Sequence, residues 1–193
     1  MLMDLQKIFT YPYDSDLLMR RQKGIRRDLL AREQVGYTDK RIAILGGSTT
    51  DDIKNILELF LLEAGIRPQF YQSEYNKYYE DAVFGNSELD EFQPEIIVVF
   101  TSVVNILECP ALGDSSNVVR DKHDAEMRRF SQIWEKLSVR YPAAIIIQNN
   151  IDLSYETGLG NLDAVESYGM TRFIELLNRS FSDYAATHDN FYL

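Results

Sequence analysis

The segment from Arg41 to Asp51 constrains the fold of this chain more than any other. A short apolar run over 42–45 ends in Gly46 and Gly47, and three hydroxyl residues follow. Two adjacent glycines suit a turn that needs positive φ or a close backbone approach. Apolar residues then recur at the spacing of an amphipathic helix, at positions 53, 56, 57, 60 and 61. The segment therefore predicts a buried strand, a tight turn and a helix.

Ser48 lies just beyond the expected carboxyl end of this strand. Open α/β sheets place their ligands at that edge. The free N–H groups at the start of the following helix would hold an anion or a developing oxyanion there. A second interpretation stays open, because Ser, Thr and Asp are preferred N-cap residues and one of the residues 48–51 is expected to cap the helix.

The chain alternates strands and helices from residue 41 onward. Further strands are expected at 67–71, 95–101, 143–148 and 190–193, and helices at 50–64, 121–140 and 162–186. Residues 72–94 are less regular and predict one or two short helices. Two of the strands are almost continuously apolar, as parallel strands covered on both faces are. We therefore predict an α/β fold, a doubly wound parallel sheet in a three-layer sandwich with 41–45 central.

The first 40 residues differ in character from the rest. Apolar residues at 17, 18, 25, 29 and 30 indicate an amphipathic helix that Asp14 or Ser15 would cap. Its polar positions are rich in Arg and Lys, which favours a solvated helix face or a docking surface for an acidic partner. We expect residues 1–40 to form an amino-terminal helical extension and residues 41–193 to form the α/β domain.

The composition argues against several classes of protein. A length of 193 residues fits one domain, and a net charge of −10 disfavours nucleic acid or an anionic membrane as partner. No apolar run approaches the roughly 18 residues of a membrane-spanning helix. The first residues lack the pattern of a signal peptide, and a single cysteine allows no internal disulfide. We expect a cytoplasmic protein with no membrane or nucleic-acid partner, no cofactor and no metal.

Small polar residues follow each of the first four expected strands. Because the carboxyl ends of parallel strands meet at one edge of a sheet, these residues predict a site lined with hydroxyls and amides. The residues at the four strand ends are Gly47, Ser48 and Thr49, then Gln72, Ser73 and Glu74, then Thr101, Ser102 and Asn105, and finally Gln148, Asn149, Asn150 and Asp152.

A Gly-Ser after the first strand, a Gly in the second connection and an Asn after the third strand resemble the block order of SGNH (GDSL-type) hydrolases. More specifically, most of the chain resembles the amino-terminal region of FkbH-like proteins. The likeness lies in the segments 9–14 (FTYPYD), 41–50 (RIAILGGSTT), 70–76 (FYQSEYN) and 91–97 (EFQPEII). In that family an SGNH-like domain precedes a haloacid-dehalogenase-like domain, in polyketide and capsular-polysaccharide pathways.

The resemblance implies an esterase or acyl-transfer function with Ser48 as the nucleophile. The N–H of Ser48, the N–H of Gly85 and the side-chain amide of Asn105 would form the oxyanion hole. It also implies two partners, an acyl carrier protein and a carboxyl-terminal haloacid-dehalogenase-like domain. Residues 41–193 would then be an SGNH-like domain that is incomplete at its carboxyl end.

The chain departs from the family pattern where the serine would be activated. The usual Gly-Asp-Ser becomes Gly46-Gly47-Ser48, Asn105 stands at a different spacing, and the closing Asp-x-x-His block has no match. His188 precedes the last strand and is expected at the opposite edge of the sheet. His123 starts a helix on the same edge, as either the base or a solvent-exposed residue. A serine without a base is a poor nucleophile, so we expect this chain alone to be a weak or inactive hydrolase.

Two other functions stay open. One is a non-catalytic module on the same fold that docks a carrier protein or a neighbouring domain. The other is a flavodoxin-like domain that binds phosphate or a nucleotide at 47–50. Three further features favour structural roles: tyrosines at 71, 75, 78 and 79 for packing, Asp51 and Asp52 for the helix dipole, and Cys109, which lacks a base.

Overall fold

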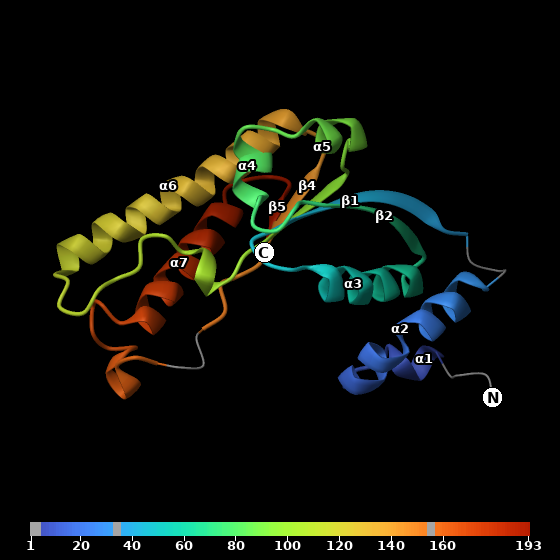
Figure 1. Cartoon of the computed structure of the whole chain (residues 1–193), viewed down its shortest axis with the longest axis horizontal. Coiled ribbons are helices and arrows are strands. Elements are labelled where there is room, and N and C mark those ends of the chain that lie inside the picture. The colour runs from blue at the N-terminus through green and yellow to red at the C-terminus, as the bar shows by residue number, and fades with distance from the viewer. Residues whose placement is uncertain (1–4, 33–35, 154–156) are drawn as a thin grey trace.

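The apolar runs of the sequence become five parallel strands of one sheet. The computed structural model describes residues 5–32, 36–153 and 157–193 (Figure 1). The strands are β1 (Thr38–Gly46), β2 (Ile66–Gln72), β3 (Ile96–Phe100), β4 (Ile145–Gln148) and β5 (Phe191–Tyr192). Their order is β2-β1-β3-β4-β5, which confirms the predicted doubly wound α/β fold. β1 is an interior strand, but β3 occupies the middle of the sheet.

Helices connect the strands and cover the sheet. They are α1 (Leu5–Ile8), α2 (Ser15–Leu30), α3 (Asp51–Glu63), α4 (Tyr78–Val83), α5 (Ser87–Phe92), α6 (Ser116–Arg140) and α7 (Met170–Ala185), with 3₁₀ turns at Val103–Asn105 and Gly160–Leu162. α6 begins five residues earlier than expected, because the Ser115 side chain accepts a hydrogen bond from the N–H of Val118 and caps it. α7 begins later than the expected residue 162, and a separate turn precedes it.

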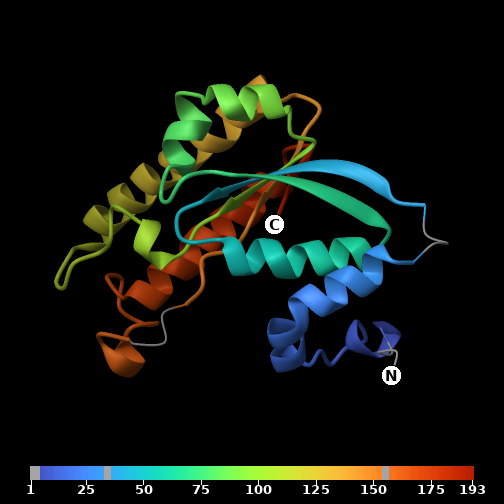
Figure 2. The ribbon, with the colours of Figure 1, turned by 45° about the vertical axis from the view of Figure 1, so that its right-hand side comes forward.

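The larger core lies between the sheet and the helices α4, α6 and α7. Ile97 and Val99 of β3 are fully buried in it, against the aromatic side chains of α6 and α7. The opposite face of the sheet is covered by α3, which lies along β1 and β2 (Figures 1 and 2). Since alternate strand residues point to opposite faces, the sheet separates two layers of helices as a three-layer sandwich requires.

The amino-terminal helix α2 packs on the outer side of α3 (Figure 2). A second core joins the two helices and contains Ile8, Leu18, Ile25, Leu29, Leu59 and Leu62. The basic side of α2 also faces α3 in part, since Arg26 Nε donates to Glu58 Oε1 at 2.8 Å. At least one of the basic side chains that were expected to face solvent or an acidic partner is therefore paired with a carboxylate of this chain.

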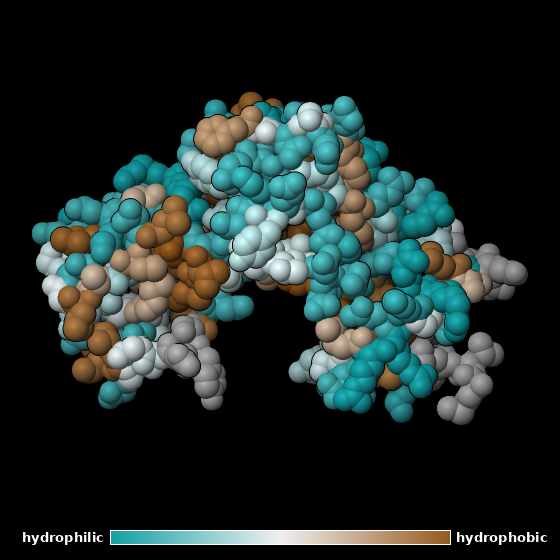
Figure 3. Space-filling view, viewed as in Figure 1, coloured by the Kyte–Doolittle hydropathy of each residue, from teal (hydrophilic) through white to brown (hydrophobic). Residues whose placement is uncertain are grey.

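Among the described residues, no helix covers one half of the α3 side of the sheet. Ile96 and Val98 of β3 alternate with core residues and point to this side, as do Ile145 of β4 and Tyr192 of β5. Ile145 is 37% exposed and Tyr192 54% exposed. We call these four residues the open half-face. Figure 3 shows the molecule hollowed beneath the sheet, between the lobe of α2 and α3 and the lobe at the start of α7.

Asp163 ties the 3₁₀ turn to the start of α7. The carboxylate is 3% exposed, and its Oδ2 accepts a hydrogen bond from the N–H of Thr171 at 2.6 Å. The hydroxyl and the N–H of Thr171 hold the pKa of Asp163 below its usual range. A carboxylate with a lowered pKa contributes stability that is complete above its unfolded pKa of about 3.9 and is lost as the pH falls through its folded pKa.

We therefore expect Asp163→Asn to reduce the free energy of unfolding at neutral pH but not in acid. Urea unfolding of both proteins should show a difference in the free energy of unfolding that is constant above about pH 5 and becomes smaller below about pH 4. Asp121→Asn, at an exposed position of α6, is the matched control and should change the free energy of unfolding only slightly. A difference for Asp163→Asn that does not change with pH would show that the carboxylate charge has no part in the cap.

Candidate functional site

Three loops meet at the carboxyl ends of β1 and β3. The chain leaves β1 for β2 on one side and returns to β3 on the other, so this is the topological switch point where doubly wound folds bind ligands. The N–H of Gly46 donates to Ser73 Oγ at 2.9 Å, and the N–H of Gly47 donates to the Phe100 carbonyl at 2.8 Å. The loops that follow β1, β2 and β3 are therefore joined by direct hydrogen bonds.

Ser48 lies half-buried in a cleft at this switch point. The cleft has a volume of about 250 Å³ and is lined by Ser48, Thr49, Thr50, Asp51, Gln72, Ser73 and Tyr75. Within the described residues, the Ser48 hydroxyl makes no hydrogen bond. The N-cap of α3 is Thr50, whose hydroxyl accepts from Gln72 Nε2 at 3.0 Å rather than capping the helix. The cleft thus combines a free hydroxyl with a helix start that no side chain caps.

Asn105 is buried next to the turn that carries Ser48. Its Nδ2 donates to the Gly47 carbonyl at 2.9 Å and to Asn76 Oδ1 at 3.3 Å. Its Oδ1 accepts from the N–H of Ser102 at 2.9 Å. The structure therefore places the Asn105 amide against Gly47, the residue before Ser48, although Asn105 does not line the Ser48 cleft. Both N–H bonds of its amide are occupied, so one must open before this side chain donates to a ligand.

Gly85 lies elsewhere. A Cβ atom at this position would meet the guanidinium of Arg140, the last residue of α6. Tyr78, at the other end of α4, instead contacts Arg129. Arg140 follows Arg129 by eleven residues, or about 16 Å of helix. Because α4 runs away from the switch point, the N–H of Gly85 is not among the groups around Ser48, and the three-donor oxyanion hole is not assembled.

Neither histidine of the chain lines the Ser48 cleft. His123 Nε2 lies 3.0 Å from Ser180 Oγ of α7, and its Nδ1 lies 3.2 Å from Asp124 Oδ1. His188 lies beyond the end of α7, stacked on Tyr184 with ring centroids 3.6 Å apart. The ionisable residues of the cleft wall are Asp51 and Tyr75, and Asp51 Oδ1 lies 3.4 Å from Lys54 Nζ. The serine thus has no imidazole base.

A buried ion pair on α6 braces the loop that carries Asn105. Arg129 Nη2 donates to the Asn105 carbonyl at 2.6 Å and to Glu126 Oε2 at 2.8 Å, while Nη1 donates to the Tyr78 hydroxyl at 2.7 Å. Burial opposes the charge of Arg129, but Glu126 and Tyr78 outweigh it and raise its pKa. The other oxygen of Glu126 accepts from the N–H groups of Leu107 and Glu108.

This ion pair is absent from the residues predicted above, although the sequence contains a signal for it. Glu126 falls on the apolar stripe of α6, between Val119 and Phe130, and is 1% exposed. A carboxylate on an apolar helix stripe needs a buried partner, and Arg129 follows it at the i+3 spacing.

The amides that follow β4 act mainly within the sheet. Gln148 is fully buried and accepts from Trp134 Nε1 at 3.1 Å, while its own Nε2 donates to Thr101 Oγ1 at 3.0 Å. Asn149 bonds both the N–H and the carbonyl of Thr101. These polar strand ends therefore join β3 to β4 rather than lining the Ser48 cleft.

Other site classes receive no support from the described residues. No group of three or more His, Cys, Asp or Glu side chains among them is arranged to hold a metal. No helix in the described ranges is both long and apolar enough to cross a membrane. Burial and the nearby carboxylate of Glu126 raise the pKa of the Cys109 thiol, which disfavours the reactive thiolate.

We expect Gly47→Ala to disturb the switch point directly. A Cβ atom at Gly47 would lie 2.4 to 2.5 Å from three side-chain atoms of Asn105, which is buried and hydrogen-bonded. Overpacking of this kind lowers the free energy of unfolding by about 1–3 kcal/mol, which urea unfolding would measure. Gly24→Ala is the control, because nothing lies within 4 Å of its added Cβ. It should be stabilising within helix α2 by about 0.5–1 kcal/mol. Equal stability of Gly47→Ala and the wild-type protein would contradict the close packing.

Comparison with known proteins gives one informative likeness. No family model and no curated protein matches the chain. Among solved structures, it is similar to the N-terminal part of the protein BF1531 from Bacteroides fragilis, described as containing a phosphatase domain complexed with Mg. The TM-score is 0.70 at 18% identity, over 89% of this chain. The chain spans 44% of that neighbour's length, and at this identity the likeness shows the fold alone.

Proposed function

We propose that this chain is an SGNH-like esterase or acyl-transfer domain of an FkbH-like protein, with Ser48 as the nucleophile. The observation that carries the proposal is the position of Ser48. Its hydroxyl has no partner among the described residues and lines a cleft at the switch point, beside the start of α3 and the amide of Asn105. The substrate class is an acyl ester or thioester, whose carbonyl oxygen would be held by donors fixed before the reaction.

The proposed reaction needs a base that neither histidine supplies at Ser48. We therefore expect slow turnover from this chain alone. In the proposal, an acyl carrier protein presents the acyl group and a haloacid-dehalogenase-like domain accompanies this one, in a polyketide or capsular-polysaccharide pathway. The support is the sequence resemblance, together with a structural neighbour that is longer than this chain and contains a phosphatase domain.

Labelling with a fluorophosphonate and hydrolysis of p-nitrophenyl acetate test the proposal. We expect the label on Ser48 and slow hydrolysis that Ser48→Ala abolishes, since a serine site without its base keeps a rate of roughly 10³-fold over water. Ser180→Ala is the matched control, because Ser180 is the serine bonded to His123. Label on Ser180, or hydrolysis unchanged in Ser48→Ala, would overturn the assignment of the nucleophile.

A second candidate is a non-catalytic module that docks a carrier protein or a neighbouring domain. The observation that favours it is the state of Asn105, whose amide is saturated by Gly47 and Asn76 while no imidazole faces Ser48. Binding of an acyl carrier protein with no label on Ser48 would favour this function over the first.

A further inference from the structure

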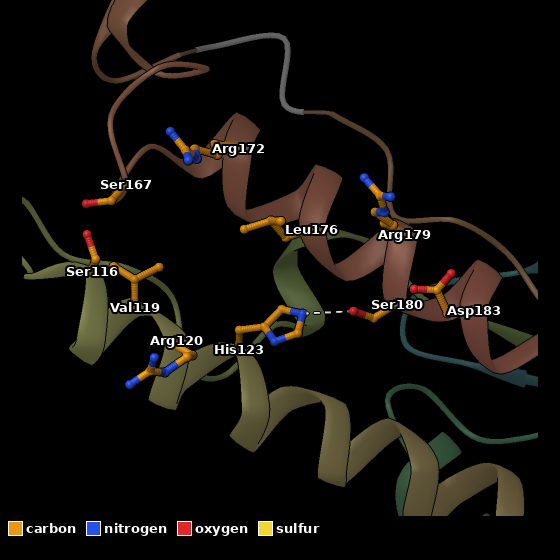
Figure 4. A pocket seen from close by; sticks show the side chains of 10 residues that line it. All are labelled: Ser116, Val119, Arg120, His123, Ser167, Arg172, Leu176, Arg179, Ser180 and Asp183. Atoms are coloured by element: carbon orange, nitrogen blue, oxygen red, sulfur yellow. Dashed lines mark hydrogen bonds between the residues drawn. The ribbon is translucent and has the colours of Figure 1, made fainter.

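The groove between α6 and α7 contains a cavity that the Ser48 site does not use. Its volume is about 330 Å³, and it shares no lining residue with the Ser48 cleft. Val119 of α6 and Leu176 of α7 form an apolar floor between the two helices (Figure 4). The hydroxyls of Ser116 and Ser167 lie at one end of the groove, and the His123–Ser180 pair lies at the other.

Three arginines border this cavity without a carboxylate partner. Arg120 donates to the side-chain oxygen of Asn117 and Arg172 donates to the Val165 carbonyl, and both acceptors are neutral. Arg179 makes no hydrogen bond or ion pair within the described residues. The wall of this cavity holds these three guanidinium groups and one carboxylate, that of Asp183, so it has an excess of positive charge in a chain whose net charge is −10.

The serine end of the groove is the end away from the one carboxylate of the cavity wall. The single acidic side chain of the cavity wall, Asp183, lies at the opposite end beside Ser180 (Figure 4). Ser116 and Met170 are the first residues of α6 and α7, so the positive ends of both helix dipoles add to the charge of Arg120 and Arg172. An anion at this end would meet two guanidinium groups and two hydroxyls.

We propose that the groove between α6 and α7 binds a small phosphate monoester that carries a short apolar group. Guanidinium groups bind phosphate oxygens through paired, charge-assisted hydrogen bonds, and Arg120 of α6 and Arg172 of α7 line the cavity from opposite helices. The apolar group would lie on Val119 and Leu176. The cavity volume falls at the lower end of the range for small-molecule sites, which limits the ligand to a small molecule.

A titration with hexyl phosphate, monitored through the NMR signals of the histidine side chains, tests the proposal. The chain has two histidines, and only His123 lines the cavity. We expect saturable shifts of the His123 signals and unchanged His188 signals. Arg120→Gln should weaken binding about tenfold, the effect of one lost hydrogen bond to a charged group. Arg128→Gln, at an exposed position of α6 outside this cavity, should leave the affinity unchanged.

Four results would overturn the proposal. These are His123 shifts that do not saturate at millimolar hexyl phosphate, equal loss of affinity in Arg120→Gln and Arg128→Gln, equal affinity for neutral hexanol, and equal affinity for inorganic phosphate. The third would show that the arginines do not recognise the ligand, and the last would show that the apolar floor contributes nothing.

Discussion

Arg129→Ala should lower the free energy of unfolding by about 3–5 kcal/mol, because it leaves a buried charge without its partner. Glu126 is 1% exposed, and in the wild-type protein its carboxylate receives two hydrogen bonds from Arg129. The substitution also removes the donors to the Asn105 carbonyl and to the Tyr78 hydroxyl. Urea unfolding followed by circular dichroism would measure the loss, and the loop at 105–108 should lose protection from amide exchange.

Two further variants separate the charge effect from lost packing. Arg128→Ala, at the adjacent and exposed position, should change the stability by less than about 0.5 kcal/mol. Combining Arg129→Met with Glu126→Gln should restore much of the stability, because a buried ion pair exchanged for uncharged groups of similar volume is often neutral. If Arg129→Ala were as stable as Arg128→Ala, the buried pair would not be the brace of this loop.

Trp134→Ala should lower the free energy of unfolding by a similar amount, about 3–5 kcal/mol. The indole is fully buried, with ring centroids 5.1 Å from Phe181, 4.8 Å from Phe191 and 4.6 Å from Tyr184. Its removal opens a cavity between α6, α7 and β5. It also leaves the buried Gln148 Oε1 without its donor.

Circular dichroism should be the readout for this variant, because Trp134 is the only tryptophan of the chain and its fluorescence disappears with it. Trp134→Phe is the graded control. It keeps much of the ring packing but loses the hydrogen bond to Gln148. Its free energy of unfolding should therefore lie between those of the wild-type protein and Trp134→Ala. A loss below about 1 kcal/mol for Trp134→Ala would mean that the core collapses around the missing ring.

The fold was predictable because its signals are local and repeated. Continuous apolar runs identified β3 and β4, and helical spacing after Gly47 identified α3. The start of α7 was harder, because residues 162–169 contain apolar positions at helical spacing but end in a turn held by Asp163. Such a bond between a side chain and a distant backbone group leaves no periodic pattern in the sequence.

The candidate site was predictable only where strand pairing determines it. Gly46 and Phe100 are partners in the sheet, so the turn that leads to Ser48 and the loop that carries Asn105 had to begin side by side. Gly85 is separated from its flanking strands by α4 and α5, and the directions of those short helices determine its position. Spacing along the chain contains no information about those directions.

The open half-face links the stability of the folded chain to its surroundings. Ile96, Val98, Ile145 and Tyr192 keep apolar area in contact with water, at a free-energy cost of about 25 cal/mol for each Å² that a cover would remove. Any molecule that binds this face in the folded state, and not in the unfolded state, raises the free energy of unfolding in proportion to the logarithm of its concentration. The melting temperature of the chain would then rise with the concentration of such a molecule.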